Sequence, residues 1–453
     1  MLSKKLLTSD QNKAIDKAFE NDATLLVGDM GVGKTIISLT TVQELLAVGF
    51  ISRVLVVAPL KVANTRWQQE CANWQHTSGL TVGIATGAPK KRMAALTDLN
   101  NDVVVINFEN LAWFCKTFKD SHGFDGLVID ELTKLKESGG TAFKKLRHRL
   151  HAFKWRLGLT GTPVSENFES LYAMCMVLDS GARLGTRKDV FMRKYFYPTD
   201  YNEYNWELLD GTGATLLKAV DDLIHVIDTT VYQAELPPFV FHPIKIELDV
   251  KSRLAYQALK QDSVLDMEGG GVLTADNAAV LTGKLQQLAN GFLYDEDGSG
   301  GFATCLHTLK IDECVRLVKK INAPVIISYW YKEDLKRLKA AFKKGIHLDG
   351  KNDDLVMSAW NRGAIDVLFI HPLAAGHGIE LQHGGSDFIF YSPIWSRDQK
   401  MQVMGRVRRK GQKADKVDVY TLLASDTVDE LIDERVEGKA SYEELLLTHF
   451  GLG

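Results

Sequence analysis

The sequence predicts an α/β protein with two parallel-sheet lobes in tandem and a helical or irregular insertion between them. Three observations indicate this class. Short β-branched runs alternate with longer helical stretches, which is typical of parallel sheets covered by helices. The alternation occurs twice, and the paired prolines of "ELPPF" (235–239) separate the two series, because proline blocks both helix and central strand. With 453 residues, the chain is also too long for one ordinary core.

Five apolar runs are the expected strands of the first lobe. They are "TLLVGD" (24–29), "RVLVVAP" (53–59), "DVVVINF" (102–108), "GLVID" (126–130) and "RLGLTGT" (156–162). The second series consists of "PVIISYW" (324–330), "DVLFIH" (366–371), "DFIFYSP" (387–393) and "KVDVYTLL" (416–423). Aromatic and polar residues dominate between the two series. We therefore place the first lobe at 1–179, the insertion at 180–235, and the second lobe with a C-terminal helix at 236–453.

The composition is that of a soluble globular protein, with 45% hydrophobic and 25% charged residues. The formal net charge of -3 gives no global basic field, although a basic groove for nucleic acid can lie within a neutral total. No apolar run approaches the roughly 18 residues of a membrane span, and the N-terminus lacks the pattern of a signal peptide. The five cysteines are scattered without a CxxC pair, so we expect a reducing cytoplasm and neither disulfides nor zinc.

The stretch "LLVGDMGVGKTIISLTT" (25–41) has the pattern of a phosphate-binding loop. Gly28, Gly33, Lys34 and Thr35 satisfy G-x-x-x-x-G-K-[ST] between a strand and a helical stretch. Glycines let backbone N–H groups converge on phosphate oxygens. Lys34 would reach the β- and γ-phosphates, and the Thr35 hydroxyl would ligate Mg²⁺. Rather than an ordinary glycine-rich turn, we predict a nucleotide-binding loop composed of Gly28, Asp29, Met30, Gly31, Val32, Gly33, Lys34 and Thr35.

The segment "FDGLVIDELTKLK" (124–136) supplies two adjacent carboxylates at the end of an apolar strand. Asp130 is placed to hold Mg²⁺, directly or through water, and Glu131 to orient and deprotonate the attacking water. Taken alone, the pair could be two exposed charges. Following a phosphate-binding loop, it indicates hydrolysis of a nucleotide.

A third segment, "QVMGRVRRKGQ" (402–412), contains Arg406 and Arg409 three positions apart, so on a helix they would share one face. Guanidinium groups brought to a γ-phosphate stabilise charge in the transition state. The alternative is a basic helix on the surface, or one that contacts a nucleic-acid backbone.

Together these motifs resemble superfamily 2 helicase-like ATPases of the Swi/Snf (chromatin-remodeller) type, in the compact form common in bacteria and phages. The resemblance extends from about residue 5 to 440. Further segments that carry it are "VVAPLKVANTRWQQE" (56–70, motif Ia), "LGLTGTPVSEN" (157–167, motif III) and "LFIHPLAAGHGIELQHGG" (368–385, motif V). The segment 402–412 is similar to motif VI, Q-x-x-x-R-x-x-R-x-G-Q, which includes Gln402. Gln11 stands where the family has its adenine-reading glutamine.

The resemblance implies two RecA-like lobes that bind ATP and Mg²⁺ in the cleft between them, with Gln402, Arg406 and Arg409 acting from the second lobe. It also implies stepping along duplex DNA with weak sequence preference and steep salt dependence. The candidate DNA contacts are Lys61, Asn107, Thr160, His371, Gly376 and Gly378. The implied setting is the cytoplasm of a bacterial or phage-infected cell, with no membrane association.

Two positions depart from the family pattern. Thr133 replaces the usual histidine of motif II, so we expect hydrolysis to be coupled to motif VI or to DNA in another way. Glu380 replaces the usual asparagine of motif V and puts a negative charge near the expected DNA path. Two further residues keep alternative interpretations: Trp67 packs in the core or stacks on bases, and Lys310 lies at a helix start or contacts DNA.

The leading hypothesis is an ATP-dependent DNA translocase, a DNA-stimulated ATPase acting on duplex or branched DNA in replication, recombination or repair. It would act as a monomer, alongside replication or recombination proteins. The first alternative is a strand-separating helicase, for which the sequence shows no wedge or hairpin. The second is a nucleotide-gated DNA-binding scaffold with little turnover, against which Glu131 and both arginines argue.

Overall fold

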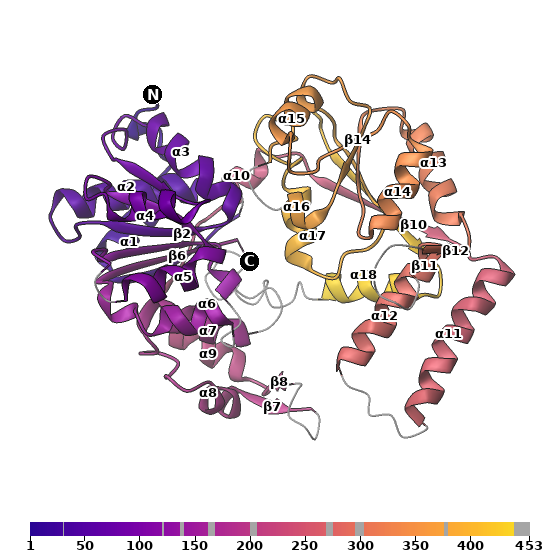
Figure 1. Ribbon diagram of the computed structural model, residues 1–453, viewed down its shortest axis with the longest axis horizontal. Coiled ribbons are helices and arrows are strands. Elements are labelled where there is room, and N and C mark those ends of the chain that lie inside the picture. Colours follow the sequence, from indigo (N-terminus) through magenta and orange to yellow (C-terminus); the bar gives the residue numbers. More distant parts are fainter. Residues whose placement is uncertain are drawn as a thin grey trace. The chain divides into compact units, whose positions relative to one another are not determined.

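The computed structural model describes residues 1–29, 31–119, 122–135, 140–161, 168–199, 206–268, 275–294, 303–375 and 379–438. The chain divides into two compact units, one from Met1 to Gln233 and the other beginning at Ala234, and each is described by itself (Figure 1). Within the described ranges, no helix is long and apolar enough to cross a membrane.

The first unit is built on a parallel sheet of seven strands in the order β3-β4-β2-β5-β6-β1-β9. The strands are β1 (Ala23–Val27), β2 (Val54–Ala58), β3 (Val82–Ala85), β4 (Val103–Asn107), β5 (Gly126–Asp130), β6 (Trp155–Thr160) and β9 (Ile224–Val226). The five predicted strands are confirmed. β2 and β4 are buried along their whole length, which is why they read as continuous apolar runs.

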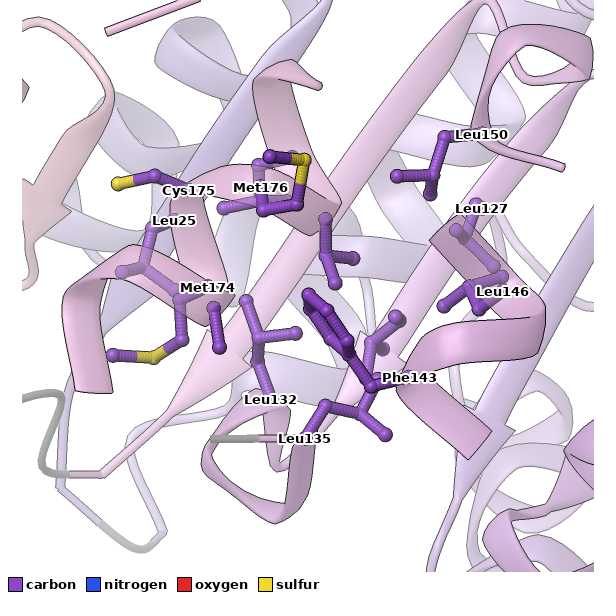
Figure 2. Close-up of a cluster of buried hydrophobic side chains, with 14 of the residues drawn as sticks. Leu25, Leu127, Leu132, Leu135, Phe143, Leu146, Leu150, Met174, Cys175 and Met176 are labelled. Atoms are coloured by element: carbon purple, nitrogen blue, oxygen red, sulfur yellow. The ribbon is translucent and has the colours of Figure 1, made fainter. Parts of the chain in front are cut away.

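Helices cover both faces of this sheet. They are α1 (Ser9–Glu20), α2 (Lys34–Ala47), α3 (Trp67–Asn73), α4 (Pro89–Thr97), α5 (Phe108–Phe118), α6 (Thr141–Arg147), α7 (Glu169–Asp179), α8 (Lys188–Tyr195), α9 (Thr212–Val220) and α10 (Thr230–Ala234). Successive side chains of β1 point to opposite faces of the sheet. Leu26 packs in the layer of α1, α2 and α3, whereas Leu25 packs in the layer of α5, α6 and α7. Figure 2 shows the second of these layers, which includes Phe143 of α6, Met174 of α7, Leu25 of β1 and Leu127 of β5.

Residues 180–233, which the sequence set apart as an insertion, are part of the first unit. Phe191 of α8 and Leu216 of α9 are buried in the same core layer as α6 and α7. A short antiparallel pair, β7 (Phe196–Pro198) and β8 (Trp206–Leu208), lies between these helices in the chain. β9 then pairs in parallel with β1 at the edge of the sheet. The segment belongs to this unit because its apolar side chains complete the unit's core.

The second unit has its own parallel sheet of six strands in the order β10-β17-β16-β13-β15-β14. The strands are β10 (Phe239–Ile246), β13 (Val325–Ser328), β14 (Ile346–His347), β15 (Val367–Ile370), β16 (Asp387–Phe390) and β17 (Val417–Ala424). The four predicted strands are confirmed, and with them the class of two tandem parallel-sheet α/β lobes. β10 follows the paired prolines directly, and its own Pro243 is tolerated because β10 is an edge strand.

The described helices of the second unit are α11 (Val250–Glu268), α12 (Ala275–Ala289), α13 (Leu309–Ile321), α14 (Lys332–Ala341), α15 (Asp353–Asn361), α16 (Pro372–Ala375), α17 (Arg397–Met404) and α18 (Val428–Gly438). A small antiparallel pair, β11 (Phe292–Tyr294) and β12 (Ala303–Cys305), follows α12. The sequence predicts a C-terminal helix in the second lobe, and α18 is the last described helix of that unit.

Candidate nucleotide site

The phosphate-binding loop joins the end of β1 to the start of α2. Gly31 and Gly33 have φ angles of +91° and +86°, in the left-handed region that side chains other than glycine rarely adopt. A Cβ atom on Gly33 would lie 2.5 Å from Nε2 of Gln11, and one on Gly31 would collide with the Tyr232 hydroxyl. Both positions therefore require glycine. Met30, a predicted loop residue, lies outside the described residues.

Lys34 is the first residue of α2 and folds back over the loop. Its Nζ donates to the backbone oxygens of Gly28 at 2.5 Å and Asp29 at 3.1 Å. Because the first backbone N–H groups of a helix have no partner within the helix, the start of α2 presents donors and partial positive charge beside this ammonium. Thr35 is the next helical residue. The loop thus combines the groups that bind phosphate.

Gln11 ties the loop to α1. Thr8 and Gln11 form a capping box at the start of α1, in which Oε1 of Gln11 accepts from the Thr8 backbone N–H at 2.9 Å. Nε2 of Gln11 donates to the Val32 carbonyl oxygen at 2.9 Å. Both polar atoms of the side chain are therefore engaged in holding the loop, and its contact with adenine stays a prediction.

Asp29 points its carboxylate at residues that follow β9. Its Oδ2 accepts from the Thr229 hydroxyl at 3.1 Å and from Nε2 of Gln233. Sequence reasoning missed both partners, because they lie about 200 positions further along the chain.

The two adjacent carboxylates lie where β5 ends. Burial, then the charge of Glu131, raises the pKa of Asp130 to about 6, while Lys34 and the Trp67 indole N–H act to lower it. The indole Nε1 donates to Oδ2 of Asp130 at 3.2 Å. Lys34 and Asp130 are therefore close enough to interact. Glu131 has a φ of +68°, an uncommon backbone conformation for a residue with a side chain, and such conformations concentrate at functional sites.

These residues fit a bound Mg²⁺ ion. A half-buried carboxylate whose pKa is raised by burial and then by an adjacent carboxylate is complementary to a divalent cation. Within the described ranges, no cluster of three or more His, Cys, Asp or Glu side chains could hold a metal by itself. In nucleotide sites, Mg²⁺ takes one or two protein ligands and completes its shell with phosphate oxygens and water. Asp130 and Thr35 are the candidate ligands.

In the second unit, α17 carries Gln402 but ends at Met404, so the expectation that Arg406 and Arg409 share a helix face is corrected. Gly405 follows the helix, and the chain continues in successive turns. Glycine favours such an exit because it has low helix propensity. Arg406 is only 4% exposed. Arg409 forms an ion pair with Glu380, 3.5 Å between Nη1 and Oε1, so the departing residue of motif V contacts motif VI.

Two of the predicted DNA contacts have side chains engaged with neighbours. Asn107 is buried at the end of β4 and shares hydrogen bonds of 2.5 Å with Glu109 and Asn110. His371 accepts from the Leu373 backbone at Nδ1, so its Nε2 donates to the Trp330 carbonyl.

Of the other predicted contacts, Thr160 is buried at the end of β6, and Lys61 is partly exposed at the start of the π-helical turn Val62–Arg66 that leads into α3. Gly376 and Gly378 lie outside the described residues. All six contacts stay predictions.

Two residues with open interpretations are settled by their contacts. Trp67 is fully buried, which excludes base stacking in this structure. Its indole N–H instead donates a hydrogen bond to the Asp130 carboxyl. Lys310 lies at the start of α13, as one of the two interpretations expected, and is 1% exposed. Its Nζ pairs with Asp429 at 2.6 Å and with Asn290 at 2.7 Å, so it does not reach DNA. Neither role is visible in the sequence, since both partners are distant along the chain.

The fold and the loop define the class: a P-loop protein with two parallel-sheet α/β units in tandem. The family's domain model, described as SNF2-related, matches residues 6–291. The chain belongs to the SNF2-related family of helicase-like ATPases, which confirms the resemblance seen in the sequence.

The chain is similar to the following individual proteins. Putative protein p41 of Acyrthosiphon pisum secondary endosymbiont phage 1 is 32% identical over 434 residues, covering 92% of this chain and 93% of that protein. The DNA repair and recombination protein RDH54 of Saccharomyces cerevisiae is 24% identical, covering 94% of this chain and 52% of that protein, so this chain spans about half its length. The Sulfolobus solfataricus SWI2/SNF2 ATPase core in complex with dsDNA has 17% identity and a TM-score of 0.46, covering 98% of this chain and 93% of that one.

Proposed function

We propose that this protein is a DNA-stimulated ATPase that uses hydrolysis to move along duplex or branched DNA. The observation that carries the proposal is the proximity of Lys34, on its left-handed glycine loop, to the Asp130 carboxyl, whose pKa it influences. Family membership supports the same activity.

The residues take the following roles. Lys34 and the start of α2 bind the phosphates of ATP, and Thr35 with Asp130 would hold Mg²⁺. The bound ion would neutralise charge on the phosphate oxygens. Glu131 orients the attacking water and takes its proton. Gln402, Arg406 and Arg409 act from the second unit, where the arginines stabilise the charge that develops on the γ-phosphate, so turnover needs groups from both units.

The relatives support DNA as the polymer along which the protein moves. RDH54 is named for DNA repair and recombination, and the alignment with it covers 94% of this chain. Movement on duplex DNA, rather than strand separation, is what the Swi/Snf type implies. We infer a role in replication, recombination or repair, as a monomer in the cytoplasm of a bacterial or phage-infected cell.

Site variants test hydrolysis. Lys34→Ala and Glu131→Gln are each expected to lower DNA-stimulated ATP turnover by at least about 100-fold, because one loses phosphate binding and the other the base. Glu131→Gln should keep its nucleotide affinity, measured by fluorescence anisotropy, whereas Lys34→Ala should lose it. Lys116→Ala, an exposed lysine of α5, is the matched control. Full turnover in either site variant would exclude the assignment.

Movement is tested separately from hydrolysis. The wild-type protein should displace a third strand from a DNA triplex in an ATP-dependent manner and leave a forked duplex paired. Unwinding of the fork without ATP-dependent displacement of the third strand from the triplex would favour the helicase alternative. Absence of multiple-turnover hydrolysis would favour the scaffold.

A further inference from the structure

The segment that leaves the first unit is attached to the phosphate-binding loop. Ile227 is buried, and its backbone N–H donates to the Val27 oxygen at 2.8 Å. The next residues reach the loop itself: Thr229 and Gln233 both donate to the Asp29 carboxylate, and the Tyr232 hydroxyl faces Gly31. The start of the connecting segment is therefore held against Asp29 and Gly31.

The Asp29 carboxylate needs a physical explanation, because its negative charge would repel a phosphate bound in the same loop. The hydrogen-bond donors Thr229 and Gln233 supply that explanation. They hold the Asp29 side chain on the connecting segment, where its charge is satisfied by hydrogen bonds. Asp29 therefore contributes a link between the loop and this segment.

The other end of the same segment is attached to motif VI in the second unit. Nε of Arg408 donates to the Pro237 carbonyl oxygen at 2.7 Å, and the Arg408 guanidinium lies 5.1 Å from the centre of the Phe239 ring. Lys410 forms an ion pair with Glu235 at 3.5 Å. Arg408 stands between Arg406 and Arg409, so the contact fixes the turn that carries both.

We propose that residues 229–239 form a strap, which ties the arginines of motif VI to the phosphate-binding loop and so helps to position them. Only residues 234–236 separate the last anchor on the loop, Gln233, from the first on Arg408, Pro237. Four residue steps span at most about 14 Å, so the strap limits how far the two anchored elements can separate. Asp29 and Arg408 are positioning residues at its two ends. The inference rests on the proposed ATP hydrolysis. It adds that the strap restrains the arginines that stabilise the γ-phosphate in that reaction.

The decisive variant lengthens the strap without removing a contact. Insertion of Gly-Ser-Gly-Ser between Ala234 and Glu235 keeps both anchors but roughly doubles the reach. We expect kcat for ATP to fall about tenfold while the nucleotide Kd changes less than about twofold, because the arginines act in the transition state and the loop is intact. The same insertion after Gly350, an exposed turn with open space around it, should leave both quantities unchanged.

Anchor variants show whether the contacts act through the strap. Asp29→Ala and Arg408→Ala should each lower kcat, and adding the insertion to either should lower it no further, because the strap is already released. Asp29→Asn keeps an acceptor oxygen for Thr229 and Gln233 and should recover most of the loss. The strap would be overturned, and the proposed function would stand, if kcat were unchanged in the insertion variant. The same holds if the insertion lowered kcat by the same factor in the anchor variants as in the wild-type protein. A wild-type protein without turnover would overturn it together with the proposed function.

Discussion

The Asp130 carboxyl is subject to opposing influences at the scale of single residues. Burial and Glu131 favour its protonated form, whereas Lys34 and the Trp67 indole favour the carboxylate. The net result is a pKa of about 6, above the 3.8 expected in the unfolded chain. The folded state therefore binds this proton more tightly. Its contribution to stability is complete below about pH 4 and is lost as the pH rises through about 6.

Asp130→Asn imitates the protonated form and is expected to stabilise the nucleotide-free, Mg²⁺-free protein at pH 7.5 by about 1–2 kcal/mol, a value reduced for the partial exposure of the group. The gain should fall to about a third of that value at pH 4.5 and vanish only below about pH 4. Urea unfolding of both proteins at the two pH values measures it. The difference is informative because Asp334 in the second unit, whose pKa burial also raises to about 6, titrates equally in both. Asp415→Asn, at an exposed position, is the control, and a variant less stable than wild type at pH 7.5 would refute this account.

At the scale of elements, the apolar runs predicted the central strands because parallel strands buried on both faces carry a continuous signal. β9 lacked that signal: it is three residues long, and its place beside β1 depends on pairing across the fold. The end of α17 at Met404 was missed because the spacing of the arginines continues a helical pattern that Gly405 interrupts. Motifs local in sequence were thus predictable, whereas the contacts of Asp29, Trp67 and Lys310 were not, since each joins distant segments.

The two ends of α2 offer a matched pair of glycines. Gly33 precedes the helix and Gly49 follows it, with φ angles of +86° and +70°. Alanine at Gly49 would meet open space and should cost about 1 kcal/mol of stability for its backbone conformation alone. Alanine at Gly33 adds the collision with Gln11, so we expect a loss of about 2–3 kcal/mol and at least tenfold weaker nucleotide binding. Chemical denaturation and nucleotide anisotropy measure both, and equal behaviour of the two variants would show that the loop geometry is not required.

At the scale of the whole molecule, 54 basic and 57 acidic side chains leave no long-range field to attract DNA. If the chain moves on DNA, attraction must come from a local set of contacts to phosphates, which release counterions when they form. With about six such contacts, DNA affinity measured by stimulation of ATP turnover should fall about 1000-fold between about 50 and about 200 mM salt. AT-rich and GC-rich duplexes of equal length should give the same curve, because phosphate contacts carry no sequence information. Basal turnover without DNA is the control and should change little, because it does not depend on contacts between the protein and DNA phosphates. Stimulation that is independent of salt, or confined to one DNA sequence, would mean that the protein reads bases and would contradict a translocase that follows the backbone.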